Sequence, residues 1–159
     1  MSRVKHKVLF QMDPFNKLNI KTDSTISIIK EALNFGIKVY VSNPDDLTLE
    51  KNSVFTNYTD ISLNGSKLSF GKIKRSNINK FDYFFIRQDP PFDLNYLTNC
   101  YLLELHQKFN EKPRFINDPG GIKNFTEKIC PIYFSDLMPK PLLHLMKRSL
   151  KIRYLVKKY

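Results

Sequence analysis

The sequence predicts an α/β domain with an open, mostly parallel sheet, helices on both faces and an inserted β-hairpin. One observation is that strand-like and helix-like patterns alternate between residues 7 and 41, as in a βαβ unit with a right-handed crossover. Another is the aromatic and β-branched run Tyr83–Ile86, which reads as a strand buried on both faces. This run is followed by Pro90-Pro91, which cannot continue a hydrogen-bonded ladder.

The first third of the chain carries clear start and stop signals. In order, the patterns predict a strand over Lys7–Met12, a helix over Thr25–Phe35 and a strand over Ile37–Val41. Asp23 or Ser24 is suited to cap the helix at its amino end, and Gly36 stands where a glycine commonly ends a helix. The two strands are therefore expected to be parallel neighbours.

The polar stretch from Asn43 to Asn79 interrupts this alternation. Asn64-Gly65 separates two short β-like segments and predicts a hairpin with a type I′ turn. The cations Lys72, Lys74 and Arg75 are interpreted as a solvated strand face, with phosphate binding as the less favoured alternative. We therefore expect an antiparallel hairpin or meander inserted between the parallel strands.

After the central strand the patterns predict mostly helix. The expected elements are a helix over Leu94–Phe109 capped by Asp93, a strand over Arg114–Ile116, a short helix within Ile122–Ile132, an exposed turn over Phe134–Pro139 and a basic amphipathic helix within Leu142–Tyr159. His106 is interpreted as a residue of the polar face of its helix, because no second candidate metal ligand lies nearby in sequence.

Composition excludes several classes of protein. The 159 residues carry a formal net charge of +11, but seven cations follow Asp136 with no acidic residue among them. Because the rest of the chain is only mildly basic, a nucleic-acid-binding face is not expected. No apolar run approaches the roughly 20 residues of a membrane span. Cys100 and Cys130 lack metal-site spacing and read as buried free thiols, so a cytoplasmic protein is the expectation.

Polar residues follow two of the predicted parallel strands. Arg87 and Asp89 end the central strand, and Asn117 follows the strand over Arg114–Ile116. Since open α/β sheets bind ligands at the carboxyl ends of their strands, these three residues predict a site at that edge. The structural alternative is that Arg87 and Asp89 simply pair with each other in a rigid turn.

Four stretches in order along the chain resemble one family. These are QMDPFNKLNIKTDST near the start, FIRQDPPFD at the central strand, FINDPGGIKNFTEK later, and YFSDLMPK. Together they are similar to the amino-terminal half of prokaryotic glutathione synthetase, over residues 8–140. The resemblance implies a Rossmann-like pre-ATP-grasp fold for residues 1–122, the start of the ATP-grasp region at 123–140, and a basic tail outside the family at 141–159.

The resemblance also implies an activity and its partners. Glutathione synthetase is an ATP-dependent ligase that joins γ-glutamylcysteine to glycine through an acyl phosphate, with ATP and Mg²⁺ as cofactors. By the matched motifs, Arg87, Asp89 and Asn117 would bind substrate, with Asp89 holding Arg87, and Lys128 would reach an ATP phosphate. Four residues of the first loop would shape it: Asp13, Asn19, Asp23 and Ser24. The resemblance implies no metal ligand within this chain.

The chain departs from the family in length and in its tail. Family members are roughly twice as long, and their second half holds the ATP-grasp fold proper. A one-base frameshift after Lys140 would turn the basic tail into a family-like sequence, so we expect a truncated and inactive synthetase whose second half is a possible partner. A standalone binding module for γ-glutamylcysteine or glutathione is the alternative. A nucleic-acid or membrane partner is not expected, and a homo-oligomer remains open.

Overall fold

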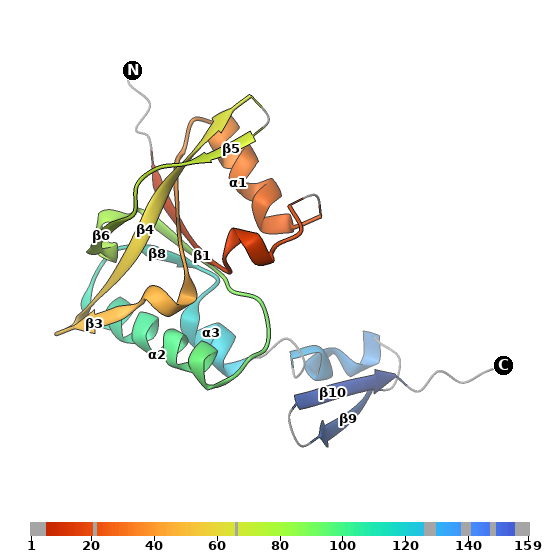
Figure 1. Ribbon diagram of the computed structural model, residues 1–159. Helices are drawn as coiled ribbons and strands as arrows, with labels where there is room; N and C mark the ends of the chain where they lie inside the picture. Colours follow the sequence, from red (N-terminus) through yellow and green to blue (C-terminus); the bar gives the residue numbers. More distant parts are fainter. Residues whose placement is uncertain are drawn as a thin grey trace. The chain divides into compact units, whose positions relative to one another are not determined.

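The computed structural model describes residues 6–20, 22–65, 67–125, 130–137, 141–146 and 149–154 (Figure 1). The chain forms two compact units, Met1–Gly120 and Gly121–Tyr159. The strands and helices of the first unit are β1 (Lys7–Met12), α1 (Ser24–Asn34), β2 (Lys38–Ser42), β3 (Thr48–Glu50), β4 (Ser53–Asn64), β5 (Lys67–Phe70), β6 (Lys74–Asn77), β7 (Tyr83–Arg87), α2 (Leu94–Phe109) and β8 (Arg114–Ile116). Helix α3 (Pro119–Asn124) crosses the boundary between the units.

One sheet organises the first unit. Its path is β3-β4-β2-β1-β7-β8, with β5 and β6 also paired to β4. Strand β1 is parallel to both β2 and β7, and β7 is parallel to β8. The predicted fold class is thereby confirmed. The parallel half of the sheet brings the carboxyl ends of β1, β7 and β8 to one edge.

Helix α1 covers one face of this sheet. Its Ile26 and Ile29 are buried in a cluster with alternate residues of β1, of which Phe10 is a member. Phe10 also stacks on Phe85 of β7 with ring centroids 4.6 Å apart. The predicted cap is present, because the Asp23 side chain accepts a hydrogen bond of 2.9 Å from the amide of Ile26.

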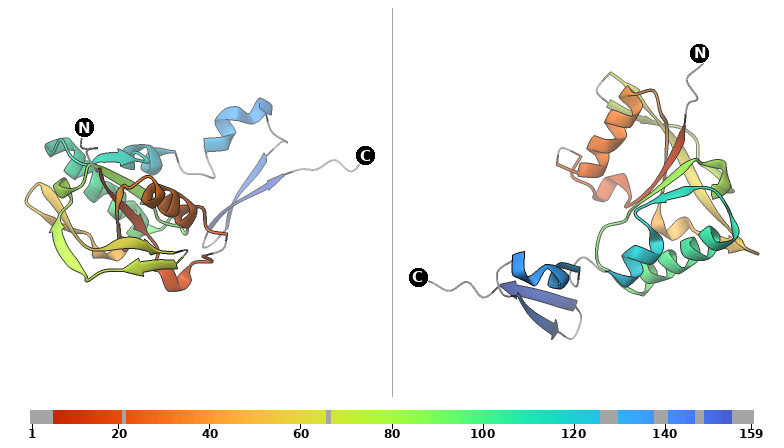
Figure 2. Two further views of the ribbon diagram at one scale, coloured as in Figure 1. Left: turned by 90° about the horizontal axis from the view of Figure 1, so that it is seen from above. Right: turned by 180° about the vertical axis from the view of Figure 1, so that it is seen from behind.

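Helix α2 covers the opposite face, as the views in Figures 1 and 2 show. Its Cys100 and Leu103 are buried, and so is Phe84 of β7, whose side chain points away from α1 because residues alternate along a strand. Asp93 caps α2 as predicted, accepting from the amide of Tyr96 at 3.0 Å. Cys100 is buried and forms no disulfide within the described part of the chain, whereas the side chain of Cys130 lies outside that part.

The inserted region extends the sheet in antiparallel fashion. The long strand β4 pairs with β2 through Val39 and Ile61 and continues beyond it into the predicted hairpin with β5. Asn64 still pairs with Lys67, and Gly65 has a φ of 61°, a conformation that glycine adopts without steric cost. The hairpin was therefore predicted correctly, but its loop begins at Gly65 and not at Asn64, which remains in the ladder. Strands β3 and β6 also pair with β4 and broaden the inserted region.

His106 corrects the sequence interpretation. Its side chain is fully buried rather than on a polar face. Nδ1 accepts a hydrogen bond from the amide of Val54 at 3.0 Å, and Nε2 lies 2.8 Å from the carbonyl oxygen of Lys112. With Nε2 protonated, the neutral ring satisfies both backbone groups. A polar residue at a helical position that faces the sheet thus links α2 to β4 and to the loop before β8.

The region after β8 also differs from expectation. The helix predicted within Ile122–Ile132 begins earlier, at Pro119, and ends at Asn124 as α3. Residues 126–129 of that predicted range lie outside the described residues. The predicted exposed turn, Phe134–Pro139, is described only as far as Leu137; this part belongs to η4 (Cys130–Leu137), two 3₁₀ turns joined at a non-helical residue, Phe134. Among the described residues, no helix is long and apolar enough to cross a membrane.

The described residues of the tail form two antiparallel strands and not the predicted amphipathic helix, while residues 147, 148 and 155–159 of that prediction lie outside the described part. Strands β9 (Pro141–Met146) and β10 (Ser149–Tyr154) pair antiparallel, with Met146 opposite Ser149. The sequence SLKIRY explains the difference, because apolar Leu150, Ile152 and Tyr154 alternate with Lys151 and Arg153. A period of two is typical of a strand, and it outweighs the weaker helical spacing of PLLHLM.

Candidate functional site

The polar residues that follow the parallel strands meet at one edge of the sheet. Met12, the last residue of β1, is the register partner of Arg87, the last residue of β7. β8 ends at Ile116, one strand further along, and is followed by Asn117. We call this region the carboxyl edge. It is the position at which the sequence predicted a ligand site.

Arg87 is held at the carboxyl edge by the first turn of α1. Its Nε donates to the hydroxyl of Thr25 at 3.0 Å, and one terminal nitrogen donates to the hydroxyl of Ser24 at 2.8 Å. Thr25 is 4% exposed, so the bond to its hydroxyl is partly shielded from water, whereas the bond to Ser24 is exposed. Two neutral partners fix the guanidinium while leaving its charge uncompensated by them.

Asp89 does not hold Arg87 in the way the motif suggested. Within the described residues, no ion pair joins the two side chains at 4.0 Å or less. Asp89 is tied to the first loop instead, since its amide donates to Asp13 Oδ2 at 3.0 Å. The simple Arg87–Asp89 pair proposed as a structural alternative is likewise not formed.

Negative charge gathers around Asp89. Burial raises the pKa of Asp89 above its usual value, the charges of Asp13 and Asp23 raise it further, and Arg87 opposes them. Arg87 therefore offsets only part of the local carboxylate charge. The carboxyl edge thus presents a fixed cation and a group of carboxylates side by side, which suits a ligand that carries both signs of charge.

The remaining predicted residues have mainly supporting contacts. Asn117 Nδ2 donates to the carbonyl oxygen of Ile86 at 3.0 Å, and this bond links the ends of β7 and β8 next to Arg87. The carbonyl oxygen of Asn19 accepts from the amides of Thr22 and Asp23, which shapes the loop before α1. Lys128, expected to reach ATP, lies outside the described residues.

A hollow of about 430 Å³, here called the acidic pocket, opens beside the carboxyl ends of β1 and β2. Asp13 and Asp46 contribute carboxylates to its wall, and Phe15, Phe70 and Ile73 contribute apolar surface. Ser42 also lines it. The sequence did not indicate a site at Asp46 or Ser42. These residues are far in sequence from Phe70 and Ile73, and only the tertiary fold of the insertion brings them to one pocket.

A polar signal in the first strand was also missed. Gln11 stands alone among apolar residues in the sequence VLFQM and is fully buried, at 0% exposure. Both polar atoms of its side chain are buried without a hydrogen-bond partner among the described residues. A lone amide in a buried strand could have marked the position, since unpaired buried polar groups are rare.

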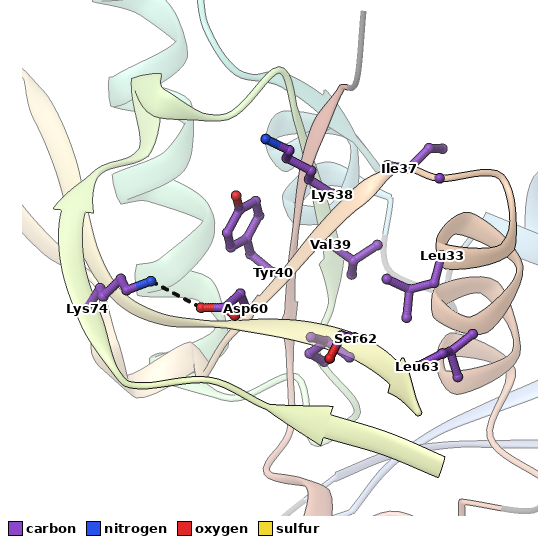
Figure 3. A pocket seen from close by; sticks show the side chains of 11 residues that line it. Leu33, Ile37, Lys38, Val39, Tyr40, Asp60, Ser62, Leu63 and Lys74 are labelled. Atoms are coloured by element: carbon purple, nitrogen blue, oxygen red, sulfur yellow. Dashed lines mark hydrogen bonds and ion pairs between the residues drawn. The ribbon is translucent and has the colours of Figure 1, made fainter. Parts of the chain in front are cut away.

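A second hollow, of about 570 Å³, lies at the other end of β2. Figure 3 shows Leu33 and Leu63 on one side of it, and on the other the Lys74–Asp60 ion pair, whose atoms are 3.2 Å apart. Lys38 begins β2, so this hollow is remote from the carboxyl ends of the parallel strands. The charges of Lys74 and Asp60 balance each other. We therefore assign this hollow no role.

The donor set of the first unit does not suggest a metal centre. Among the described residues, no group of three or more His, Cys, Asp and Glu side chains is placed to hold a metal ion. Asp13 and Asp89 meet through a backbone amide and not around a shared cation position. The chemistry available here is recognition of charged groups by Arg87, carboxylates and hydroxyls.

Comparison with known proteins identifies the family. The model of the prokaryotic glutathione synthetase N-terminal domain matches residues 6–123. Glutathione synthetases of Mesorhizobium japonicum and Rhodopseudomonas palustris are each 34% identical to the chain, over 88% and 86% of it and over 45% and 44% of their own lengths. The enzyme of Wigglesworthia glossinidia brevipalpis is 31% identical over 87% of the chain. The chain spans less than half the length of these curated relatives. It belongs to the prokaryotic glutathione synthetase family and carries that family's N-terminal domain.

Proposed function

We propose that this chain is the substrate-binding part of a glutathione synthetase, the ligase that joins γ-glutamylcysteine to glycine at the expense of ATP. The carrying observation is Arg87, which stands at the carboxyl edge of a family domain with hydroxyl partners and no carboxylate partner among the described residues. A fixed guanidinium in that position can take a substrate carboxylate bidentately. The curated relatives are named for this activity.

The surroundings of Arg87 explain how it would select its ligand. Ser24 and Thr25 hold one edge of the guanidinium, which orients the planar group and reduces the rotamer entropy lost on binding. Asn117 sets the end of β7 through its bond to Ile86. These contacts pre-organise the site before substrate arrives, which reduces the entropy cost of binding.

ATP and Mg²⁺ are further parts of the proposal. ATP would activate the substrate carboxylate for attack by the glycine amine. Lys128 would contact its phosphate, by the motif match and without support from the described residues. Because those residues furnish no metal site, Mg²⁺ would be held by the part of the ligase that the relatives have beyond the matched stretch. This chain by itself is therefore proposed to bind substrate without turning it over.

The relation to a second half is testable at the DNA level. The family model ends at residue 123, and the tail strands β9 and β10 lie beyond it. If the tail arises from a one-base shift after Lys140, the genomic sequence will show a second reading frame just downstream that encodes an ATP-grasp half. Co-expression of that half with this chain should then restore glutathione synthesis. A downstream region that encodes nothing of the kind would rule out the frameshift.

Binding of substrate to the isolated chain tests the proposal directly. Titration calorimetry with γ-glutamylcysteine in the absence of ATP should show one site. Arg87→Ala should weaken binding about 10- to 100-fold, from the loss of a charge-assisted pair. The affinity of Arg87→Lys should lie between those of wild type and Arg87→Ala, because lysine keeps the charge but lacks the planar guanidinium. Arg75→Ala is the control, since Arg75 pairs with Glu50 on the antiparallel part of the sheet. Equal affinities of wild type and Arg87→Ala would contradict the proposal.

A further inference from the structure

The wall of the acidic pocket includes a buried hydroxyl that the fold itself does not use. Ser42 is 5% exposed, and its hydroxyl oxygen has no hydrogen-bond partner among the described residues. Gln11, its register partner on β1, is fully buried with both amide atoms unpaired. A buried polar group that is left without a partner destabilises the fold. Gln11 does not line the pocket, but Ser42 does, and its unpaired hydroxyl in the pocket wall indicates a place that can receive a polar ligand.

The charge on the pocket wall defines the sign of that ligand. Asp13 and Asp46 both line it, and none of the described residues that line it is Lys, Arg or His. Each carboxylate has one acceptor position in use, Asp13 toward the amide of Asp89 and Asp46 toward the side-chain amide of Asn57 at 3.3 Å. The remaining lone pairs are available to a donor. The wall is therefore complementary to a cation that donates hydrogen bonds.

The apolar part of the pocket narrows the class of cation. Phe15 and Phe70 meet edge to face, with ring centroids 4.6 Å apart, and Ile73 is 79% exposed beside them. A hydrated divalent cation gains nothing from such a wall, and Asp13 and Asp46 are not part of any group of three metal-binding side chains among the described residues. A primary ammonium group on a short aliphatic body uses both the carboxylates and the apolar surface.

Asp13 connects this pocket to Arg87. Its carboxylate lines the pocket and also accepts from the amide of Asp89, two residues after Arg87. Neighbouring loops of one sheet edge thus offer a guanidinium and a pair of carboxylates. That arrangement complements a molecule with a free ammonium group and a free carboxylate, such as an amino acid or a short peptide.

We propose that the acidic pocket binds the free α-ammonium group of the γ-glutamyl substrate through Asp13 and Asp46, with Ser42 as an additional polar partner, while Arg87 takes a carboxylate of the same molecule. This inference rests on the proposed function, which supplies the substrate class. It assigns Asp46 and Ser42 a role in recognising the amino end, and it predicts that a substrate with a blocked amino group is rejected.

The test compares two ligands on matched variants. Calorimetry would measure binding of γ-glutamylcysteine and of its N-acetyl derivative to wild type, Asp13→Asn, Asp46→Asn and the control Asp45→Asn. Asp45 is exposed, neighbours Asp46 in the same 3₁₀ turn and does not line the pocket, so its substitution makes the same change of charge. Urea unfolding of each variant would confirm that the fold is retained.

The expected result is a coupled loss. Wild type and Asp45→Asn should bind γ-glutamylcysteine about 10- to 100-fold more tightly than its N-acetyl derivative. For Asp46→Asn the two ligands should have nearly equal affinity, because the partner of the ammonium group is gone. Ser42→Val should weaken the binding of γ-glutamylcysteine about 3- to 10-fold, which corresponds to the loss of one neutral hydrogen bond.

Other outcomes separate this inference from the proposed function. Equal affinity of wild type for both ligands, with Arg87→Ala still impaired, would overturn the ammonium site and leave the proposed function standing. No binding of either ligand to wild type would overturn both. Binding of Mg²⁺ alone that disappears in Asp46→Asn would replace the ammonium group by a metal ion and so overturn the assignment.

Discussion

Single residues in this domain act mainly through partners that come from distant parts of the sequence. Arg87 depends on hydroxyls more than sixty positions earlier, and His106 bonds a strand amide 52 residues before it. In both cases a side chain from one element satisfies or orients a group on another. The role of each residue therefore depends on the hydrogen-bond partners that the tertiary fold places beside it. Replacing the residue leaves those partners unpaired, which can be measured as a loss of stability or binding.

His106 gives the sharpest residue-scale prediction. His106→Ala should lower the free energy of unfolding by about 3 kcal/mol, because the Val54 amide and the Lys112 carbonyl lose their partner and the ring leaves a void. Urea denaturation at pH 7.5 would measure it. Lys108→Ala, on the same helix but exposed, is the control and should change stability by less than about 0.5 kcal/mol.

The pH dependence of the same residue has a defined sign. Burial lowers the pKa of His106 in the folded protein. The unfolded chain, in which the histidine has its ordinary pKa of about 6.5, therefore binds a proton more readily than the folded one. Wild-type stability should fall as the pH drops below about 6.5 toward the lowered folded pKa, and His106→Ala should lack this decline. Parallel stability curves for the two proteins would contradict the assignment.

At the scale of elements, local signals predicted what local physics decides. Short-range hydrogen bonds fix the helix caps Asp23 and Asp93, and φ preferences fix the glycines that follow α1 and β4, Gly36 and Gly65. The turn lies one residue later than predicted, because Asn64 is still paired with Lys67. The acidic pocket was not predictable in the same way, because Asp13, Asp46 and Phe70 become neighbours only through tertiary folding. The prediction of a helix in the tail was wrong for another reason. The apolar residues of the tail match both the helical period of 3.6 and the strand period of 2, and only the alternation in SLKIRY favours a strand.

Gly36 tests the helix-end signal. It follows α1 with a φ of 75°, and its amide bonds the carbonyl oxygen of Leu33 at 2.9 Å. No atom lies within 4 Å of the position of an added Cβ, so a substitution is penalised by backbone conformation alone. Gly36→Ala should cost about 1 kcal/mol of unfolding free energy, Gly36→Asn less and Gly36→Val more. Urea denaturation would rank them, and equal stability of all three would contradict a left-handed cap.

At the scale of the molecule, the chain divides into two units that are expected to differ in stability. The first unit, through Gly120, contains the whole eight-stranded sheet and the cluster under α1. The second unit contains the 3₁₀ helix η4 and the two-stranded sheet of β9 and β10. A two-stranded sheet alone is marginally stable in water, whereas a sheet with helices on both faces is a complete core. The free energy of folding should therefore reside almost entirely in the first unit.

Truncation after Phe125 tests this division. The shortened chain should keep the urea unfolding free energy of the full chain within about 0.5 kcal/mol, because the core lies before the cut. It should also keep the affinity for γ-glutamylcysteine, since Arg87, Asp13 and Asp46 are all retained. In the full chain, hydrogen exchange should be slow in β1 and β7 and fast in β9 and β10.

The opposite pattern would show that the tail has a binding surface of its own. A loss of more than about 2 kcal/mol on truncation would exceed what a marginal hairpin can supply by itself, so β9 and β10 would have to be packed against other protein. Slow exchange in both tail strands would imply the same. Repeating the exchange measurement over a range of protein concentrations then separates the two possible supports. Protection that grows with concentration requires a second copy of the chain, whereas protection independent of concentration requires the first unit of the same chain.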